Sequence, residues 1–484
     1  MGRYISVMGL RVARHVASIL PLMVLWGTTP VALAQEIPVV ISAYSVAAPR
    51  TEVASGLVAR AILPAGLTCP SVRVGLLNGN VRLVAMQERP RPENTSSAFA
   101  PLIVCSAPIP KGARQASIAG KVIPAAMPRE IQRMALLGDS GCRVTSWEVQ
   151  NCSDPAQWPL SRIGQSVATD KPDVIVFNGD FFYREAPCPT GQEALCAASP
   201  GQIPGLPFTD SAYGWMADVF VPLAPMLSAA PLVVIRGNHE ECSRGGNGYF
   251  YFFDSRQGTT STCAPLMVNG VPTAPAMAPT ATYPIDLRVS STRTLRLAIV
   301  DSSGGNDLSV SPYAVIQRPA YEQAASMAMP GAGRESWLIT HRPIFGFASS
   351  VFDAPGQAVV WGSADQAAAA WGLLGNYDLV FSSHMHIAEV VQLPGLPSQL
   401  ILGNAGTLLD PVSGYDLPTQ GFTVGPGQTY PVPRSAWVDV RFGYAIATPQ
   451  EAPGTWRLQM RDPAGADFAT CGLRNQQLYC RTLP

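Results

Sequence analysis

Short apolar runs separated by Gly-, Pro- and Asn-rich turns fill residues 36 to about 130. No helical period of apolar positions is sustained over this stretch, and β-branched residues are common in the runs, so they predict strands. The runs lie at residues 38–41, 57–62, 71–76 and 102–105. Short strands at this spacing favour a small β-domain arranged as a sandwich. A Pro-containing segment at residues 123–128 marks its end, so we expect this domain over residues 35–130.

From residue 131 onward, apolar runs alternate with segments that predict helices, which is the signature of an α/β layer fold. The predicted strands cover residues 134–137, 173–177, 232–235, 295–300, 337–340 and 379–381. The predicted helices cover residues 160–168, 213 to before Pro222, and 365–374. After residue 404 only short β-like runs follow, for example at residues 437–440 and 444–447. We therefore expect an α/β domain over residues 131–410 and a β-rich extension of it over residues 411–484.

The start of the chain has the pattern of a secretory signal peptide. Three arginines precede an apolar run at residues 16–25, and Ala32 and Ala34 form a small-x-small cleavage site. The alternative is an uncleaved membrane anchor, because residues 16–34 are just long enough to span a bilayer. The cleavage site favours a signal peptide over residues 1–34. We therefore expect a secreted or periplasmic protein without stable membrane insertion.

The composition narrows the possible partners. Lys and Arg total 33 and Asp and Glu total 33, so no net charge attracts nucleic acid or an anionic membrane.

The ten cysteines are an even number, which in an exported chain indicates disulfides. Spacing leaves the connectivity open, and the simplest hypothesis joins sequence neighbours. The pairs are then Cys69 with Cys105, Cys142 with Cys152, Cys188 with Cys196, Cys242 with Cys263, and Cys471 with Cys480.

Polar residues with metal-binding side chains follow the predicted strands of the α/β region. Four of the five histidines lie there, and the fifth, His15, belongs to the signal peptide. A single histidine at a strand end is usually structural or solvated, but four of them beside Asp and Asn residues indicate one shared site. Carboxyl ends of strands are where open α/β sheets bind their ligands, and this set of oxygen and nitrogen donors suits Fe, Zn or Mn. The candidates are Asp139, Asp180, Tyr183, Asn238, His239, His341, His384 and His386.

The ordered set resembles the calcineurin-like metallophosphoesterases, and within them the purple acid phosphatases. Gly-Asp-Ser-Gly, Gly-Asp-x-x-Tyr, Gly-Asn-His-Glu and His-x-His blocks run in the family's order between Asp139 and His386. The first block lacks the family's usual histidine, because Gly141 stands there. Purple acid phosphatases use the tyrosine of the second block instead, and Tyr183 occupies that position. Ser383 departs from the pattern, since the family usually has Gly before the His-x-His pair.

The resemblance implies a four-layer αββα metallophosphoesterase sandwich, here preceded by the small β-sandwich-like domain. It also implies two metal ions, iron with a second iron, zinc or manganese. Asp180 would bridge the two ions, and His239 would stabilise phosphate charge and protonate the leaving group. By the same resemblance Asp139, Tyr183 and His386 would hold the first ion, and Asn238, His341 and His384 the second.

The expected function is that of an exported phosphohydrolase, acid phosphatase-like, which cleaves phosphate monoesters by in-line attack of metal-bound hydroxide. A phosphodiesterase or nucleotide hydrolase is the enzymatic alternative for the same site. A secreted binding protein with a structural metal site is the alternative from another class, and the complete ligand set speaks against it. Among the neighbouring residues, Glu240 is expected to orient its loop and Asp301 to be structural, whereas Arg244 and Arg342 either contact substrate or lie in solvent.

Overall fold

The computed structural model describes residues 39–91, 96–196, 210–256, 267–268, 271–272, 280–329, 331–348, 359–360, 363–410, 421–433 and 435–484. The predicted signal peptide lies outside these residues. No helix in the described ranges is long and apolar enough to cross a membrane.

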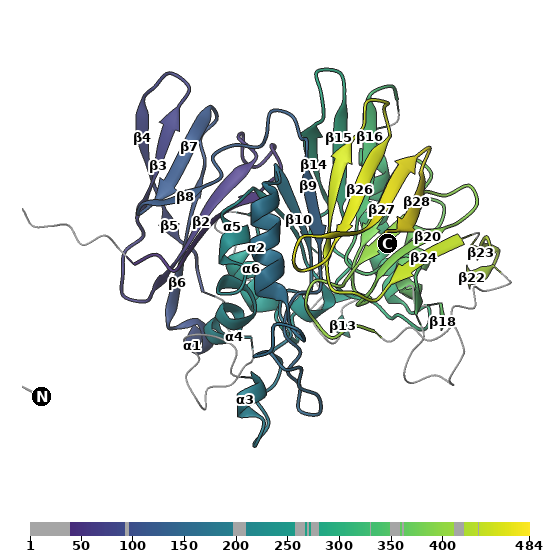
Figure 1. The fold of residues 1–484 in the computed structure, drawn as a ribbon, viewed down its shortest axis with the longest axis horizontal. Coiled ribbons are helices and arrows are strands. Elements are labelled where there is room, and N and C mark those ends of the chain that lie inside the picture. Colours follow the sequence, from purple (N-terminus) through teal and green to yellow (C-terminus); the bar gives the residue numbers. More distant parts are fainter. Residues whose placement is uncertain are drawn as a thin grey trace, which may run out of the picture. The chain divides into compact units, whose positions relative to one another are not determined.

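The first large sheet has eleven strands in the order β28-β27-β26-β25-β9-β10-β11-β1-β2-β6-β5 (Figure 1). Its centre is formed by β9 (Met134–Leu137), β10 (Val174–Asn178) and β11 (Leu232–Ile235), which pair in parallel. All three are buried along their length, which explains why they appear in the sequence as uninterrupted apolar runs. The flanking strands are β1 (Ser42–Ala47), β2 (Leu57–Pro64), β5 (Gln87–Glu88), β6 (Leu102–Pro108), β25 (Tyr444–Pro449), β26 (Trp456–Arg461), β27 (Asp467–Arg474) and β28 (Gln477–Thr482).

The second large sheet has seven strands in the order β14-β15-β16-β19-β21-β20-β24. Strands β15 (Thr294–Ile299), β16 (Arg334–Ile339), β19 (Leu379–Ser382) and β21 (Gln399–Leu402) pair in parallel. The antiparallel neighbours are β14 (Tyr283–Arg288), β20 (Ala388–Gln392) and β24 (Ser435–Asp439).

The two sheets pack face to face, because one cluster of buried side chains joins Leu136 and Val176 of the first sheet to Ile339 and Phe381 of the second. Helices cover the outer faces, since Phe177 on the other side of β10 belongs to a separate cluster with helical residues. On the first sheet these helices are α2 (Leu160–Asp170), α4 (Ala212–Trp215), α5 (Ala224–Leu227) and α6 (Gly246–Phe252). On the second they are α7 (Tyr313–Met327) and α8 (Ala364–Ala370). The layers therefore follow the predicted order α, β, β, α.

The N-terminal region is rich in strands, as predicted, but its strands divide between two sheets. Strands β3 (Ser71–Leu76), β4 (Val81–Ala85), β7 (Ala113–Ile118) and β8 (Lys121–Ile123) form a separate four-stranded sheet. Strand β1 instead pairs in parallel with β11, with Val46 opposite Leu232. Hydrogen bonds of the first large sheet thus cross the domain boundary predicted near residue 130, and the boundary itself stays a prediction.

The helices differ from the sequence prediction in two ways. The segment expected to be helical from residue 213 is divided into α4 and a π-helix, η2 (Met216–Phe220). Helices α6 and α7 were not expected. Four of the seven residues of helix α6 are aromatic and none is charged, and α7 contains Pro319, so neither shows the usual amphipathic pattern. The remaining short elements are α1 (Ser96–Phe99), α3 (Glu193–Cys196), η3 (Asn238–Glu240), β12 (Met267–Val268), β13 (Val271–Pro272), β17 (Phe347–Ala348), β18 (Val359–Val360), β22 (Phe422–Gly425) and β23 (Gln428–Tyr430).

Disulfides join four of the five predicted pairs of neighbouring cysteines. The bonds are Cys69–Cys105, Cys142–Cys152, Cys188–Cys196 and Cys471–Cys480. Cys242 is also disulfide-bonded, and its predicted partner Cys263 lies outside the described residues. Bonds at Cys142 and Cys188 close loops next to the predicted site, so they limit the movement of the residues that flank it.

Candidate metal centre

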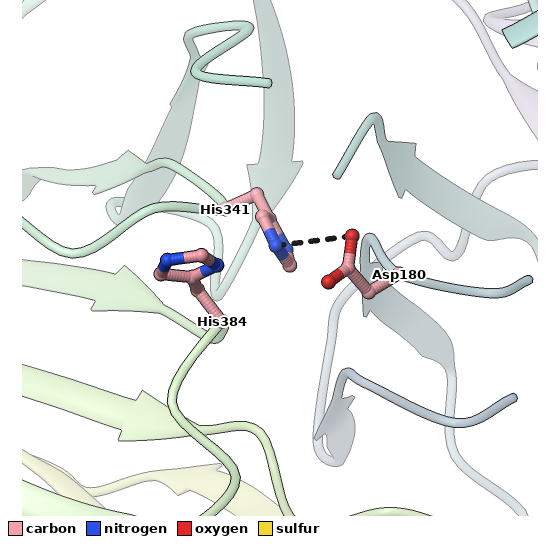
Figure 2. Close-up of side chains that lie close together, drawn as sticks. All are labelled: Asp180, His341 and His384. Atoms are coloured by element: carbon pink, nitrogen blue, oxygen red, sulfur yellow. Dashed lines mark ion pairs between the residues drawn. The ribbon is translucent and has the colours of Figure 1, made fainter. Parts of the chain in front are cut away.

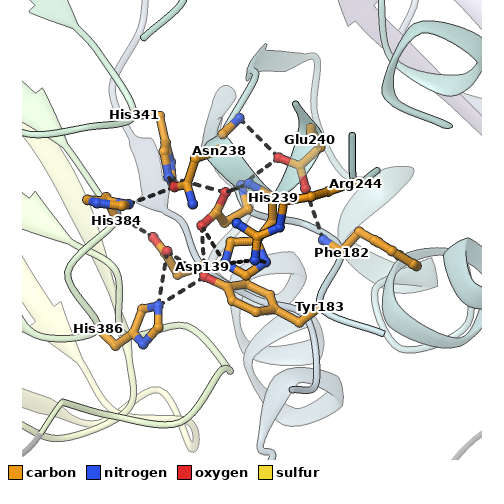
Figure 3. A network of polar contacts seen from close by, with 12 residues as sticks. Asp139, Phe182, Tyr183, Asn238, His239, Glu240, Arg244, His341, His384 and His386 are labelled. Carbon is orange, nitrogen blue, oxygen red and sulfur yellow. Dashed lines mark hydrogen bonds and ion pairs between the residues drawn. The ribbon is translucent and has the colours of Figure 1, made fainter. Parts of the chain in front are cut away.

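The candidate residues meet where the parallel strands of both large sheets end. Asp139 follows β9, Asp180 follows β10 and Asn238 follows β11, while His341 and His384 follow β16 and β19 of the facing sheet. Figure 3 shows the side chains of Asp139, Asn238, His341 and His384 pointing toward one another. Parallel strands place their carboxyl ends at the same edge, which is why residues far apart in sequence come together here.

Three of these residues have a backbone conformation that is uncommon for anything but glycine. The φ angles are 56° at Asp139, 51° at Asp180 and 74° at His384. Left-handed conformations at such residues cost about 1–3 kcal/mol each and concentrate at functional sites. The turns leave no room for side chains nearby, because a Cβ on Gly179 would lie 2.5 Å from the Nδ1 atom of His341. Gly179 is therefore required for the close approach of the two sheets.

One group of ligand atoms gathers around the phenol of Tyr183. Its Oη atom lies 2.9 Å from Asp139 Oδ1, 2.8 Å from Asp180 Oδ2 and 2.9 Å from His386 Nε2. All four side chains are buried. A phenol has one proton and cannot donate to all three neighbours, so this group has more acceptors than donors.

A second group gathers around the amide of Asn238. Its Oδ1 atom lies 3.0 Å from His341 Nε2 and 2.7 Å from His384 Nδ1. Asp180 Oδ1 lies 3.2 Å from the same His341 nitrogen (Figure 2). Since Asp180 Oδ2 contacts Tyr183, Asp180 contributes one oxygen to each group. Asp180, His341 and His384 are close enough for one atom of each to bind a single ion. Oxygen and nitrogen lone pairs that converge in this way fit a cation.

The pKa shifts of the buried acidic groups also indicate that the centre lacks positive charge. Burial raises the pKa of Asp139 well above its ordinary value, and the charge of Asp180 raises it further. Burial acts on Asp180 in the same direction, but the neighbouring His341 and His239 outweigh it and lower its pKa. Burial, followed by the charges of both carboxyls, raises the pKa of Tyr183. Two buried carboxyls and a phenol thus crowd together, and positive charge between them would favour their ionised forms.

Each of the four histidines directs one ring nitrogen at this centre and the other at an oxygen. Such outer contacts set the ring orientation and the tautomer of metal-binding histidines. Burial also lowers the pKa of His386 to about 4, which favours the neutral imidazole that binds metals. The outer contacts are Asn178 O at 2.8 Å for His341, Asp307 Oδ2 at 3.2 Å for His384, Asp410 Oδ1 at 3.6 Å for His386 and Glu185 Oε1 at 2.8 Å for His239.

Glu240 connects two of the loops through backbone contacts, as predicted. Its carboxyl oxygens accept hydrogen bonds from the backbone N–H groups of Asp180 at 2.8 Å, Phe181 at 2.8 Å and Gly237 at 3.0 Å. Phe182 N donates a further bond at 3.1 Å. Glu240 is fully buried, so these donors have no water to replace it. The side chain therefore determines where the loop carrying Asp180 lies relative to the loop carrying Asn238.

Replacement of Glu240 by alanine is expected to lower the free energy of unfolding by about 3 kcal/mol or more, because four buried N–H groups lose their acceptor. Urea titration followed by tryptophan fluorescence measures this change. Glu240→Gln retains an acceptor oxygen and serves as the control, with a smaller expected loss. Equal stability of the alanine variant and the wild type would contradict this role of Glu240.

Several residues around the centre escaped the sequence interpretation. Asp218 lies on the π-helix η2 and accepts hydrogen bonds from Tyr183 N at 2.8 Å and Cys142 N at 3.2 Å. It also forms a fully buried ion pair with Arg184 at 2.7 Å. Arg184 was detectable as the neighbour of Tyr183, whereas Asp218 stands in a region with no strand end or motif. Its place in the centre arises only from the fold.

The structure locates Asp301, which was expected to be structural, and Arg342, whose role was left open. Asp301 forms a buried ion pair with Arg236 at 3.0 Å and accepts a hydrogen bond from Ser303 N, which agrees with a structural role. Arg342 pairs with Asp307, and its Nη1 atom lies 3.2 Å from His384 Nε2. Arg342 is therefore beside the centre and not in open solvent.

Comparisons with known proteins agree with this architecture. The family described as calcineurin-like phosphoesterase matches residues 135–388. A solved structure of purple acid phosphatase PPD1 from seeds of yellow lupin (Lupinus luteus) aligns with a TM-score of 0.53 and 13% identity, covering 91% of this chain and 74% of that chain. A structure of PhoD aligns with a TM-score of 0.48 and 11% identity, covering 91% of each chain. No curated protein matches the sequence. At this identity the lupin structure shows a likeness of fold.

Proposed function

The chain belongs to the calcineurin-like phosphoesterase family, and on that premise we propose that it is an exported dinuclear-metal enzyme that hydrolyses phosphate monoesters. Hydrolysis of phosphoesters follows from the family. The dinuclear centre, the preference for monoesters and the export are our proposal. The disulfides support export, because such bonds persist in oxidising compartments.

The position of Asp180 is the observation that carries the dinuclear proposal. Its two oxygens belong to different groups of buried ligand atoms, Oδ2 to the group around Tyr183 and Oδ1 to the group around Asn238. Each group would hold one cation, with Asp180 shared. The first cation would take Asp139, Tyr183 and His386 as ligands, and the second would take Asn238, His341 and His384.

Two bound cations would neutralise phosphate charge and lower the pKa of water, which supplies a nucleophile near neutral pH. The protein residues orient the reaction around them. Asp180 is held by His239 N, which donates to Oδ1 at 2.8 Å, so the carboxylate cannot rotate away from either group. The imidazole of His239 lies with Nε2 3.8 Å from Asp180 Oδ2, so it borders the centre.

His239 is proposed to bind the phosphate and to protonate the leaving oxygen. Burial and the charge of Arg244 lower the pKa of its imidazole to about 4, while Asp180 and Glu185 act in the opposite direction. A phosphate anion beside the ring would act in the same direction as these two carboxyls and raise the pKa of the imidazole. Glu185 holds Nδ1 at 2.8 Å and keeps Nε2 directed at the centre.

Elemental analysis of the purified protein, combined with assays on monoesters and diesters, tests the proposal. We expect two metal ions per chain and faster hydrolysis of monoesters. Protein with a full metal content that hydrolyses neither class would contradict a phosphohydrolase. Faster hydrolysis of diesters would retain the dinuclear site and replace the proposed substrate.

Tyr183→Phe tests whether the first cation is iron, as we propose for a phenol ligand in this group. The wild-type protein is expected to absorb visible light through a tyrosinate-to-iron transition, and the variant to lose the band because the only nearby phenol oxygen among the described residues is gone. Absorption spectra and iron analysis of both proteins measure this. Tyr213→Phe, which changes a tyrosine outside the centre, is the control. A colourless wild type with zinc or manganese would retain the family and exclude iron.

A further inference from the structure

Arg244 extends the proposed centre on the side of Asn238 and His239. The loop after η3 turns back, with Gly245 N donating to His239 O at 2.8 Å, so the Arg244 side chain returns to the site. Its guanidinium forms a two-pronged ion pair with Glu185, through Nε to Oε1 and through Nη2 to Oε2 at 2.9 Å. The same Nη2 atom lies 2.7 Å from His239 Nδ1. Two of the three guanidinium nitrogens are therefore engaged.

The third nitrogen, Nη1, faces the amide of Asn238. When Asn238 Oδ1 points at His341 and His384, its Nδ2 atom lies 3.2 Å from Arg244 Nη1, so two hydrogen-bond donors face each other. The opposite orientation of the amide would remove this conflict, but it would turn the nitrogen toward the ligand atoms where a cation requires the oxygen. With the oxygen on the cation side, the two facing donors are open to an acceptor from solvent or from a bound anion.

We propose that Arg244 Nη1, Asn238 Nδ2 and His239 form a subsite for one non-bridging oxygen of the substrate phosphate, and that this subsite favours monoester dianions over diesters. This inference rests on the proposed function and adds the residues that determine the preference for monoesters over diesters. An anionic oxygen accepts from both facing donors, and hydrogen bonds between charged groups are the strong ones. A monoester dianion presents three non-bridging oxygens that share two negative charges, whereas a diester has two that share a single charge, with a second ester oxygen at the third position.

Glu185 is the positioning residue of this subsite. Because it holds Nε and Nη2 together, the planar guanidinium keeps Nη1 directed at Asn238. The side chains of Glu185 and Arg244 are 20% and 28% exposed, so solvent reaches the pair. The pair therefore belongs to the accessible side of the site.

Arg244→Gln tests the proposal through binding of inorganic phosphate, measured by calorimetry, and through the ratio of kcat/KM for a monoester to that for a diester. Loss of one charge-assisted bond is expected to weaken phosphate binding roughly 10- to 100-fold. The monoester to diester ratio is expected to fall by a similar factor, with metal content unchanged. Arg244→Lys keeps the charge without the planar fork, so it is expected to recover only part of the affinity.

Arg296→Gln is the matched control, because Arg296 makes the same two-pronged contact with Asp286, at 2.7 and 2.8 Å, outside the centre. It is expected to leave phosphate binding and the ratio unchanged. Glu185→Gln is a second variant, in which Arg244 is retained but its ion-pair partner is changed. We expect it to lower phosphate affinity and the monoester to diester ratio less than Arg244→Gln does.

Unchanged phosphate affinity and an unchanged ratio in Arg244→Gln, at full metal content, would overturn the subsite. An equal loss on monoester and diester, without weaker phosphate binding, would also overturn it. The calorimetric result separates the inference from the proposed function. A wild type that binds phosphate through Arg244 but hydrolyses no ester would contradict the function and retain the subsite.

Discussion

Asp180→Asn is expected to abolish hydrolysis, with kcat/KM falling about a thousand-fold or more, equivalent to about 4 kcal/mol of activation free energy. Asp180 is completely buried and uses both oxygens, Oδ1 beside His341 at 3.2 Å and Oδ2 beside Tyr183 at 2.8 Å. Asparagine keeps one oxygen and replaces the other by an amide nitrogen, which does not bind hard cations. The shared ligand is therefore lost from one of the two groups in either amide orientation.

The metal content of the same variant distinguishes loss of a bridging ligand from general damage. We expect it to fall below that of the wild type, by elemental analysis, while the far-ultraviolet circular dichroism spectrum stays the same. Asp301→Asn is the matched control, because Asp301 also follows a strand and is buried, but it pairs with Arg236. That variant is expected to lose stability and retain its metals. Unchanged hydrolysis by Asp180→Asn would exclude the dinuclear mechanism.

Asp218→Ala is expected to lower the free energy of unfolding by about 3–5 kcal/mol, the usual cost of removing one partner of a buried ion pair. Arg184 and Asp218 are both fully buried at 2.7 Å, so alanine would leave the guanidinium charge without its carboxylate. The substitution also removes the acceptor of Tyr183 N and Cys142 N. We therefore expect weaker metal binding together with the loss of stability, although Asp218 is not a proposed ligand.

Denaturant titration measures this loss. The control is Asp439→Ala, because Asp439 pairs with Arg441 at the same distance, 2.7 Å, with the arginine side chain 49% exposed. Exposed ion pairs contribute less than about 1 kcal/mol, so this variant is expected to unfold close to the wild type. Similar stability losses in both variants would show that burial of the Arg184–Asp218 pair does not matter.

The fold class and the strand ends were predictable because they depend on local patterns. Strands β9, β10 and β11 are buried on both faces, and such strands appear as short continuous apolar runs. Asp139 and Asp180 come just after their strands in the sequence. They were therefore identifiable as strand-end residues without knowledge of the neighbouring strands. The N-terminal strands were also recognised, but the parallel pairing of β1 with β11 was not, since nothing in either strand specifies a partner so distant in sequence.

Tyr183 lies three residues after Asp180, and the roles of both as candidate ligands came from the resemblance to the family. The sequence by itself determined the α/β layering and the ordered set of donor atoms, whereas the disulfide connectivity came from the structure. Only the tertiary structure shows which carboxylates contact the candidate ligand residues from outside the centre. Glu185, Asp218, Asp307 and Asp410 reach the centre from loops and helices whose side-chain patterns are those of ordinary surface or helical residues. These residues act through contacts between segments that are distant in sequence. Such contacts leave no local pattern in the sequence, because only folding brings the segments together.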